Sequence, residues 1–161
     1  MSKNQSPYML ETAFNYLHAA KLLWGKGNLS GVAMVNAAIA IEIILKSFIA
    51  TPTDNIRKGT SGEQYELKGK KPHLLTDLAK KVDPSLFEEL GFQDYLYWFN
   101  EYDNLFVNAR YPYEPCSRKG HIEIPIKVGI SMFNSVIEWY KRTGNKDSWV
   151  INYPNVSGGG L

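Results

Sequence analysis

Apolar residues recur at helical spacing along most of the chain, and this pattern predicts the fold. From Pro7 to Trp24 they return every three or four residues, which is typical of one face of an amphipathic helix. Ser6 and Pro7 supply a start signal, because a proline in the first turn loses no hydrogen bond that the helix needs. The sequence GKGN at residues 25–28 then interrupts the pattern.

The second periodic segment, residues 29–50, is apolar on most sides, which indicates the central helix of a bundle. Asn36, Glu42 and Lys46 divide it into short apolar runs, so we interpret it as a buried core helix rather than a membrane span. Glu42 precedes Lys46 by four residues, the favourable order for an ion pair on a helix. Thr51 and Pro52 end the segment.

Residues 55–72 are glycine-rich and net basic, and we expect a mobile loop or a short hairpin there. Two interpretations stay open. The segment is either a solvated connector between helices or a flap that attracts phosphate over a nearby site.

Helical periodicity returns after this basic loop. It predicts helices over about 73–82, 84–90, 91–110 and 125–142, with Asp83 as a cap and Pro84 in the first turn of the second. The helix over 91–110 carries two aromatic stripes. The stripe with Trp98, Tyr102 and Leu105 suggests a second buried face, and therefore a partner chain or a ligand.

These segments predict an all-α fold, a compact bundle of about five helices. We expect one domain over residues 1–145 and a flexible C-terminal tail over 146–161, because the last residues are rich in glycine and polar side chains.

Composition restricts the kinds of partner and the cellular compartment that we expect for this protein. The 161 residues carry a formal net charge of +2, too small to imply nucleic-acid binding by charge alone. The single cysteine, Cys116, rules out an internal disulfide and suits a reducing compartment. The N-terminus lacks the layout of a signal peptide. We therefore expect a cytoplasmic protein with no membrane contact.

The chemistry-bearing residues do not form a familiar metal or cofactor site. His18, His73 and His121 are scattered, and Cys116 has no partner at ligand spacing. Neither a phosphate-binding glycine loop nor a serine-centred nucleophile motif occurs. We expect no metal and no cofactor.

Arg110, Arg118 and His121 are the strongest candidates for a functional site. Arginine holds a phosphate through its planar fork, and histidine carries protons near neutral pH. An arginine and a histidine in one groove would suffice to cleave RNA without a metal. The alternative is that Arg110 simply stabilises the C-terminal end of its helix.

Four sequence elements together resemble the HEPN family (higher eukaryotes and prokaryotes nucleotide-binding domains). They are the opening helix FNYLHAAKLLWGKG, the segment with Ala38, Glu42 and Lys46, the segment with His73, Leu74 and Leu78, and the ending Arg110-Tyr111-Pro112. The resemblance covers about residues 8–142. It implies an all-α bundle that forms homodimers.

The resemblance implies two activities. In HEPN ribonucleases four to six residues separate the arginine from the histidine, whereas ten separate Arg110 from His121 here. That branch implies a toxin or antiviral effector that uses Arg110 and His121, with Arg118.

The other branch resembles HEPN proteins that bind a nucleotide or pair with a nucleotidyltransferase or an antitoxin. It implies a ligand site with Arg110 and Tyr111, to which we add Lys46, Lys70, Lys71 and His73 as residues that would line the same cleft, with aromatics between Tyr95 and Tyr102 stacking a base. A non-catalytic helical adaptor is the third interpretation.

Overall fold

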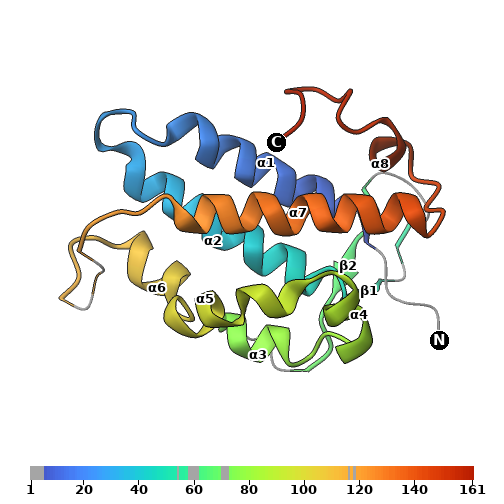
Figure 1. Cartoon of the computed structure of the whole chain (residues 1–161), viewed down its shortest axis with the longest axis horizontal. Coiled ribbons are helices and arrows are strands. Elements are labelled where there is room, and N and C mark those ends of the chain that lie inside the picture. The colour runs from blue at the N-terminus through green and yellow to red at the C-terminus, as the bar shows by residue number, and fades with distance from the viewer. Residues whose placement is uncertain (1–5, 54, 58–61, 70–72, 116, 118) are drawn as a thin grey trace.

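The computed structural model describes residues 6–53, 55–57, 62–69, 73–115, 117 and 119–161, and within them the chain is a bundle of helices (Figure 1). In chain order the elements are α1 (Pro7–Leu23), η1 (Gly27–Leu29), α2 (Ser30–Lys46), β1 (Thr51–Pro52), β2 (Tyr65–Glu66), α3 (Leu75–Ala79), α4 (Pro84–Glu89), η2 (Phe92–Tyr95), α5 (Leu96–Glu101), α6 (Leu105–Arg110), α7 (Ile124–Arg142) and α8 (Ser148–Asn152). The all-α prediction is confirmed.

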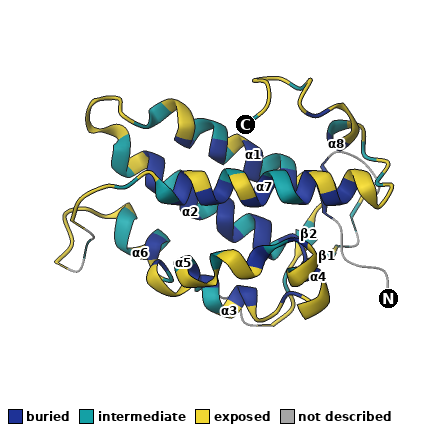
Figure 2. Ribbon diagram, in the orientation of Figure 1, coloured by how far each residue is buried: buried dark blue, intermediate teal, exposed yellow. Residues whose placement is uncertain are grey.

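Three long helices form the frame of the bundle. α1 and α2 pack side by side as an antiparallel pair, and α7 lies across both in Figure 1. The short helices α3 and α6 pack on another side of α2. Burial follows this arrangement, with the buried stripes of α2 and α7 facing each other (Figure 2).

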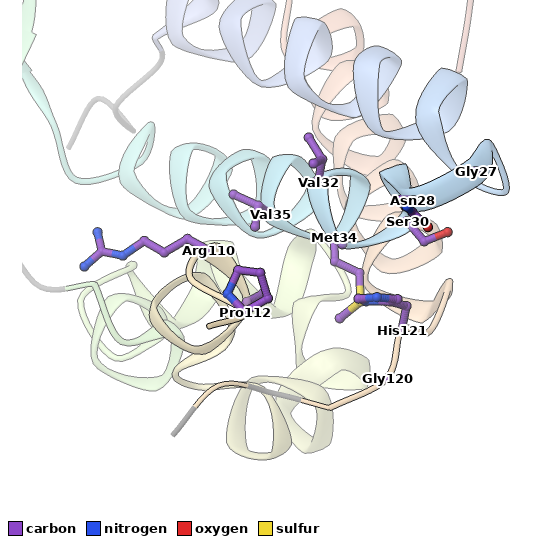
Figure 3. A pocket seen from close by; sticks show the side chains of 12 residues that line it. Gly27, Asn28, Ser30, Val32, Met34, Val35, Arg110, Pro112, Gly120 and His121 are labelled. Carbon is purple, nitrogen blue, oxygen red and sulfur yellow. The ribbon is translucent and has the colours of Figure 1, made fainter. Parts of the chain in front are cut away.

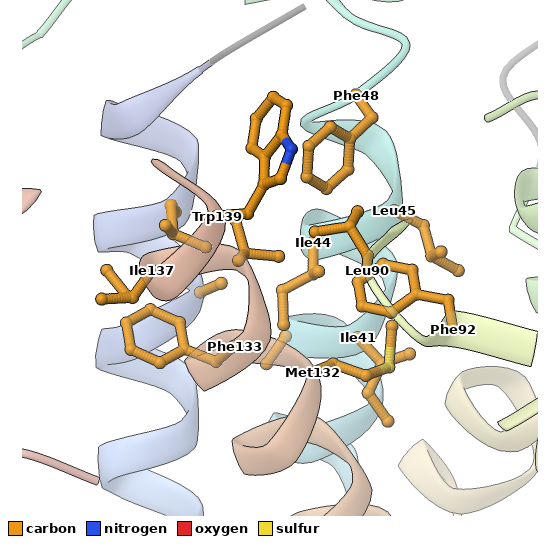
Figure 4. Packing of buried hydrophobic residues seen from close by; sticks show 14 of the residues in the cluster. Ile41, Ile44, Leu45, Phe48, Leu90, Phe92, Met132, Phe133, Ile137 and Trp139 are labelled. Atoms are coloured by element: carbon orange, nitrogen blue, oxygen red, sulfur yellow. The ribbon is translucent and has the colours of Figure 1, made fainter. Parts of the chain in front are cut away.

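The core lies between α2 and α7, where their apolar side chains interlock with those of the α4–η2 region (Figure 4). Ile44, Phe133 and Phe92 are each fully buried. The Trp139 ring packs edge-on to Phe48 at 5.8 Å between centroids. This packing fixes α2 as the central helix, as its apolar sequence predicts.

Taken together, η1 and α2 (Gly27–Lys46) are long and apolar enough, by length and composition, to cross a membrane, and their most apolar stretch has a mean hydropathy of 1.7. It sits in the middle of the bundle, yet only 44% of its most apolar stretch is buried there. The helix thus lies in the bundle as its sequence predicts, and its exposed large apolar side chains are Leu29 and Val32.

The helix predicted over residues 91–110 is three elements, η2, α5 and α6, with a break at Tyr102–Asn104. Asp103 accepts hydrogen bonds from the Thr76 amide (2.8 Å) and hydroxyl (2.7 Å), and so caps α3 from outside that helix. The Tyr102 ring stacks on Trp98 at 5.2 Å. These tertiary contacts override the local helical pattern.

The second aromatic stripe is therefore satisfied inside the molecule. Tyr102 and Leu105 are buried against Met34 and Ala38 of α2. The stripe needs neither a partner chain nor a ligand to cover it, which corrects the interpretation from sequence.

Two two-residue strands pair here, β1 just before the basic segment 55–72 and β2 within it. Thr51 pairs with Glu66 and Pro52 with Tyr65 in an antiparallel ladder, so the short hairpin is present at the base of the loop.

The C-terminal segment differs from the flexible tail that its composition predicts. Residues 148–152 form α8, which Asp147 caps by accepting a hydrogen bond from the Val150 amide (3.1 Å). Val150 is fully buried, and the Trp149 and Tyr153 rings pack edge-on to Phe14. The burial of these aromatic rings therefore orders a segment whose glycine-rich composition predicts a flexible tail.

Candidate functional site

A pocket of about 410 Å³, which we call the α2 pocket, lies at the N-terminal end of α2, where this helix meets the residues that follow α6 and precede α7. The start of α2 with the 3₁₀ turn η1 forms one wall, the end of α6 a second, and the loop before α7 the third (Figure 3). Arg110 and His121 both line this pocket. The loop after Pro112 therefore does return His121 to the neighbourhood of Arg110.

Contacts with α2 hold His121 in place. Gly31 lies in the first turn of α2, and a Cβ atom there would come within 3.0 Å of His121 Cε1. The next residue, Ile122, donates its backbone N–H to Met34 Sδ at 3.4 Å. The absence of a side chain at Gly31 thus lets the imidazole rest on the helix.

Arg110 shares the pocket, but its charged end points elsewhere. The guanidinium carbon lies 5.0 Å from the centre of the Phe106 ring and 4.7 Å from that of Tyr111, both cation–π distances. Figure 3 shows the side chain extending away from His121. The two predicted catalytic groups therefore share a pocket without pointing at a common atom.

A second cluster surrounds the carboxylate of Glu42, which is only 8% exposed. Lys46 Nζ donates to Glu42 Oε1, and His73 Nδ1 lies 3.0 Å from the same oxygen. The His73 ring is 6.3 Å from that of Phe106, on which Arg110 also rests. Lys46 and His73 are thus close to Arg110 through Phe106, but they do not line the pocket.

Tyr111 continues the row of rings beyond Arg110. Its ring lies 5.8 Å from that of Tyr113, which is 81% exposed. Tyr111 holds the guanidinium from one side and stays accessible from the other. The remaining predicted site residues, Lys70, Lys71 and Arg118, lie outside the described residues.

The predicted base-stacking aromatics between Tyr95 and Tyr102 are mostly core. Phe99 is 1% exposed and Tyr102 is 9% exposed, while Trp98 stacks on Tyr102. Only Tyr97 presents most of its ring to solvent, at 69%. The prediction that this segment stacks a base is therefore wrong for its buried members.

Sequence reasoning missed the start of α2. Gly27, Asn28, Ser30 and Gly31 line the pocket, and no side chain makes a capping hydrogen bond at the start of η1 or of α2. The N-terminal end of a helix carries partial positive charge, although the Leu29 N–H just before α2 already donates to the Lys26 carbonyl (3.0 Å). The glycines of GKGNLSG were the available signal, because they permit close approach to this backbone.

Among the described residues, no three histidine, cysteine or carboxylate side chains gather where they would bind a metal ion. The groups that the pocket offers a ligand are one imidazole, one arginine and the polar start of a helix. Such groups suit an anion.

Comparison with known proteins gives no relative from which a role for the pocket could be transferred. No family model matches the chain, and neither a curated protein nor a solved structure matches it.

Proposed function

We propose that this chain is a HEPN-like module that binds a nucleotide, or a similar phosphate-bearing ligand, in the α2 pocket without cleaving it. The divergence of Arg110 from His121 supports binding over cleavage. Metal-free cleavage of RNA needs the proton carrier and the phosphate-holding cation on one reacting group.

The chemistry of the pocket suits a phosphate. Ser30 and Gly31 at the start of α2 line the pocket at the positive end of a helix, and His121 adds an imidazole. The stem of Arg110 forms part of the wall. Its guanidinium would neutralise charge that extends toward Phe106 and Tyr111.

The size of the pocket suits a small organic anion. Its volume of about 410 Å³ falls within the range of pockets that hold drug-sized ligands. Tyr111 and Tyr113 follow Arg110 in the chain, and their exposed rings are accessible to a base.

Thermal melting across a panel of nucleoside mono-, di- and triphosphates tests the proposal. A ligand present at about one hundred times its Kd should raise the Tm by about 5–10 °C for a domain of this size. His121→Ala should abolish most of the shift, and Arg110→Ala should reduce it.

Arg142→Ala is the matched control, because Arg142 also ends a helix, α7, but donates a hydrogen bond to Glu89 of α4 and does not line the pocket. It should keep the full ligand shift. The absence of any shift across the panel for the wild type would overturn the nucleotide part of the proposal.

A metal-independent ribonuclease is the second candidate, and the presence of Arg110 and His121 in one pocket favours it. Incubation of single-stranded RNA with the protein in the presence of a chelator distinguishes a binding module from a ribonuclease. Intact RNA agrees with a binding module. Cleavage that Arg110→Ala and His121→Ala both abolish would replace the proposal with the ribonuclease, and with a role as a toxin or antiviral effector.

A further inference from the structure

A second pocket, of about 490 Å³, lies near the C-terminal end of α2, away from the α2 pocket. We call it the hairpin pocket. The helices α1 and α2 contribute Tyr8, Met9 and Ile43 to its lining, and the segment around the β1–β2 hairpin contributes Arg57, Glu63 and Tyr65. Its volume falls within the range of pockets that hold small organic ligands.

The helix side of the hairpin pocket is largely apolar. Met9 and Ile43 are partly exposed there, and the Tyr8 residue is 41% exposed. Thr12, which also lines this side, donates its hydroxyl hydrogen to the Tyr8 carbonyl (2.9 Å). An aliphatic or aromatic group of a ligand would therefore lose its contact with water against this side.

The hairpin side carries two opposite charges that lie close together. Among the described residues that line the pocket, the charged ones are Arg57 and Glu63. Gly62 immediately precedes Glu63, and a Cβ atom at Gly62 would lie 3.5 Å from Arg57 Cδ. The stem of the arginine therefore runs along the backbone next to the glutamate.

Tyr65 helps to hold the carboxylate of Glu63 in place. Its hydroxyl donates to Glu63 Oε2 at 3.3 Å. Burial, and then the charge of Glu63, raise the pKa of the Tyr65 hydroxyl to about 12, so that the hydroxyl keeps its proton at neutral pH. A carboxylate accepts hydrogen bonds from several donors, and this bond is therefore compatible with a further N–H from a ligand.

We propose that the hairpin pocket binds a free α-amino acid with an apolar side chain. The planar fork of Arg57 matches the two oxygens of an α-carboxylate. The carboxylate of Glu63 would accept from the α-ammonium group. The side chain of the ligand would then lie on Tyr8, Met9 and Ile43.

The two neighbouring charges favour such a ligand over a simple ion. A phosphate would be attracted by Arg57 but repelled by Glu63, and for a simple amine the two effects are reversed. A ligand that carries both charges on adjacent atoms is attracted by both residues. Burial of its apolar side chain adds to the binding.

NMR titration of the full ¹⁵N-labelled chain with L-phenylalanine and with L-leucine tests the proposal. Both should give saturable shifts of the Gly62 and Thr12 amide signals and leave Gly31, in the α2 pocket, unchanged. Phenylalanine amide lacks the carboxylate and N-acetyl-phenylalanine lacks the ammonium group. Each should bind at least about tenfold more weakly than phenylalanine, because a charge-assisted hydrogen bond is lost.

Variants assign each charge to its partner. Arg57→Gln should abolish the preference for phenylalanine over its amide, and Glu63→Gln the preference over the N-acetyl form. Glu66→Gln is the matched control, because Glu66 is an exposed carboxylate of β2 that does not line the pocket, and it should bind phenylalanine as the wild type does.

The ligand series on the wild type decides the matter even if a variant fails to fold. Equal affinity for phenylalanine and its two derivatives would overturn the proposal, because neither charge would then be recognised. The absence of saturable shifts at millimolar phenylalanine would also overturn it, as would shifts centred on Gly31 instead of Gly62.

Discussion

Gly31 is the residue on which the placement of His121 depends. It lies in the first turn of α2, and within a helix glycine is about 0.5–1 kcal/mol less favourable than alanine. A Cβ atom would lie 3.0 Å from the His121 ring, which is exposed and free to shift by a few tenths of an ångström. Glycine at this position thus lowers the stability of the helix but allows a close contact between α2 and His121.

We predict that Gly31→Ala raises the free energy of unfolding by about 0.5–1 kcal/mol. It should also displace the imidazole and weaken ligand binding. Urea denaturation measures the change in stability. The NMR chemical shift of the His121 Hε1 proton reports the displacement of the imidazole. An unchanged shift would show that Gly31 does not position the ring.

Gly129→Ala is the matched comparison in α7, with the opposite sign expected. There the new Cβ would lie 2.6 Å from Leu17 Cδ2 and 3.4 Å from Ile41 Cγ1, and Leu17 is fully buried. Overpacking of a core costs about 1–3 kcal/mol, more than the gain in helix propensity. A gain in stability would contradict the tight packing of α7 on α1.

Glu11 gives a prediction for pH dependence. Burial, and then the charge of Asp147, raise the pKa of its carboxyl above the ordinary value. Ionised Glu11 therefore destabilises the fold above its folded-state pKa, and this cost vanishes below the unfolded-state pKa. Glu11→Gln should stabilise the protein at about pH 7 by up to about 0.5 kcal/mol, because the group is mostly solvated.

The advantage of Glu11→Gln should disappear by about pH 3, where both states are protonated. Urea denaturation at both pH values measures it, with Glu138→Gln on the exposed side of α7 as the control. An equal gain at both pH values would show that the effect is not electrostatic.

Local spacing explains part of the candidate site and long-range contact explains the rest. Phe106 and Arg110 are four residues apart on one helix, so their cation–π contact follows from the sequence. The same holds for the Glu42–Lys46 pair. The return of His121 depends on Gly31, ninety residues earlier, and spacing around His121 carries no information about that contact.

At the scale of elements, the long helices were predictable because each carries a full helical period and end signals. α1, α2 and α7 begin and end within a few residues of the sequence expectation. The segment 91–110 was not, because the break in it is caused by residues elsewhere in the chain. Asp103 satisfies the N-terminus of α3 rather than continuing its own helix.

We predict that Asp103→Ala lowers the free energy of unfolding by about 1–2 kcal/mol, the usual cost of losing a helix cap. Both Thr76 bonds, to the amide and to the hydroxyl, are lost together. Asp94→Ala, at an exposed position in η2, is the control for removing a nearby carboxylate. Equal effects of the two substitutions in urea denaturation would mean that the cap contributes little.

At the scale of the whole molecule, the core and the α2 pocket occupy different parts of the bundle. α7 and the short helices cover one side of the α1–α2 pair and form the core. Val32 is 47% exposed and Val35 is partly exposed at the start of α2, and both line the pocket there. The pocket therefore lies at the edge of the bundle, outside its core.

The C-terminal segment tests where the domain ends. Composition predicts a boundary near residue 145, but Val150 is fully buried and the neighbouring ring of Trp149 packs on Phe133 and Phe14. Val150→Ala should lower the free energy of unfolding by about 1–3 kcal/mol. Ile151→Ala, one residue on and 53% exposed, should change it by less than about 0.5 kcal/mol.

Urea denaturation followed by tryptophan fluorescence and by far-ultraviolet circular dichroism measures both variants. The two probes should give coincident transitions, because α8 unfolds together with the bundle if its side chains belong to the core. Equal stability of Val150→Ala and Ile151→Ala would show that the segment is a separate tail. The packing of Phe14 and Phe133 against Trp149 and Tyr153 argues for the larger domain, since these rings bury one another across α1, α7 and α8.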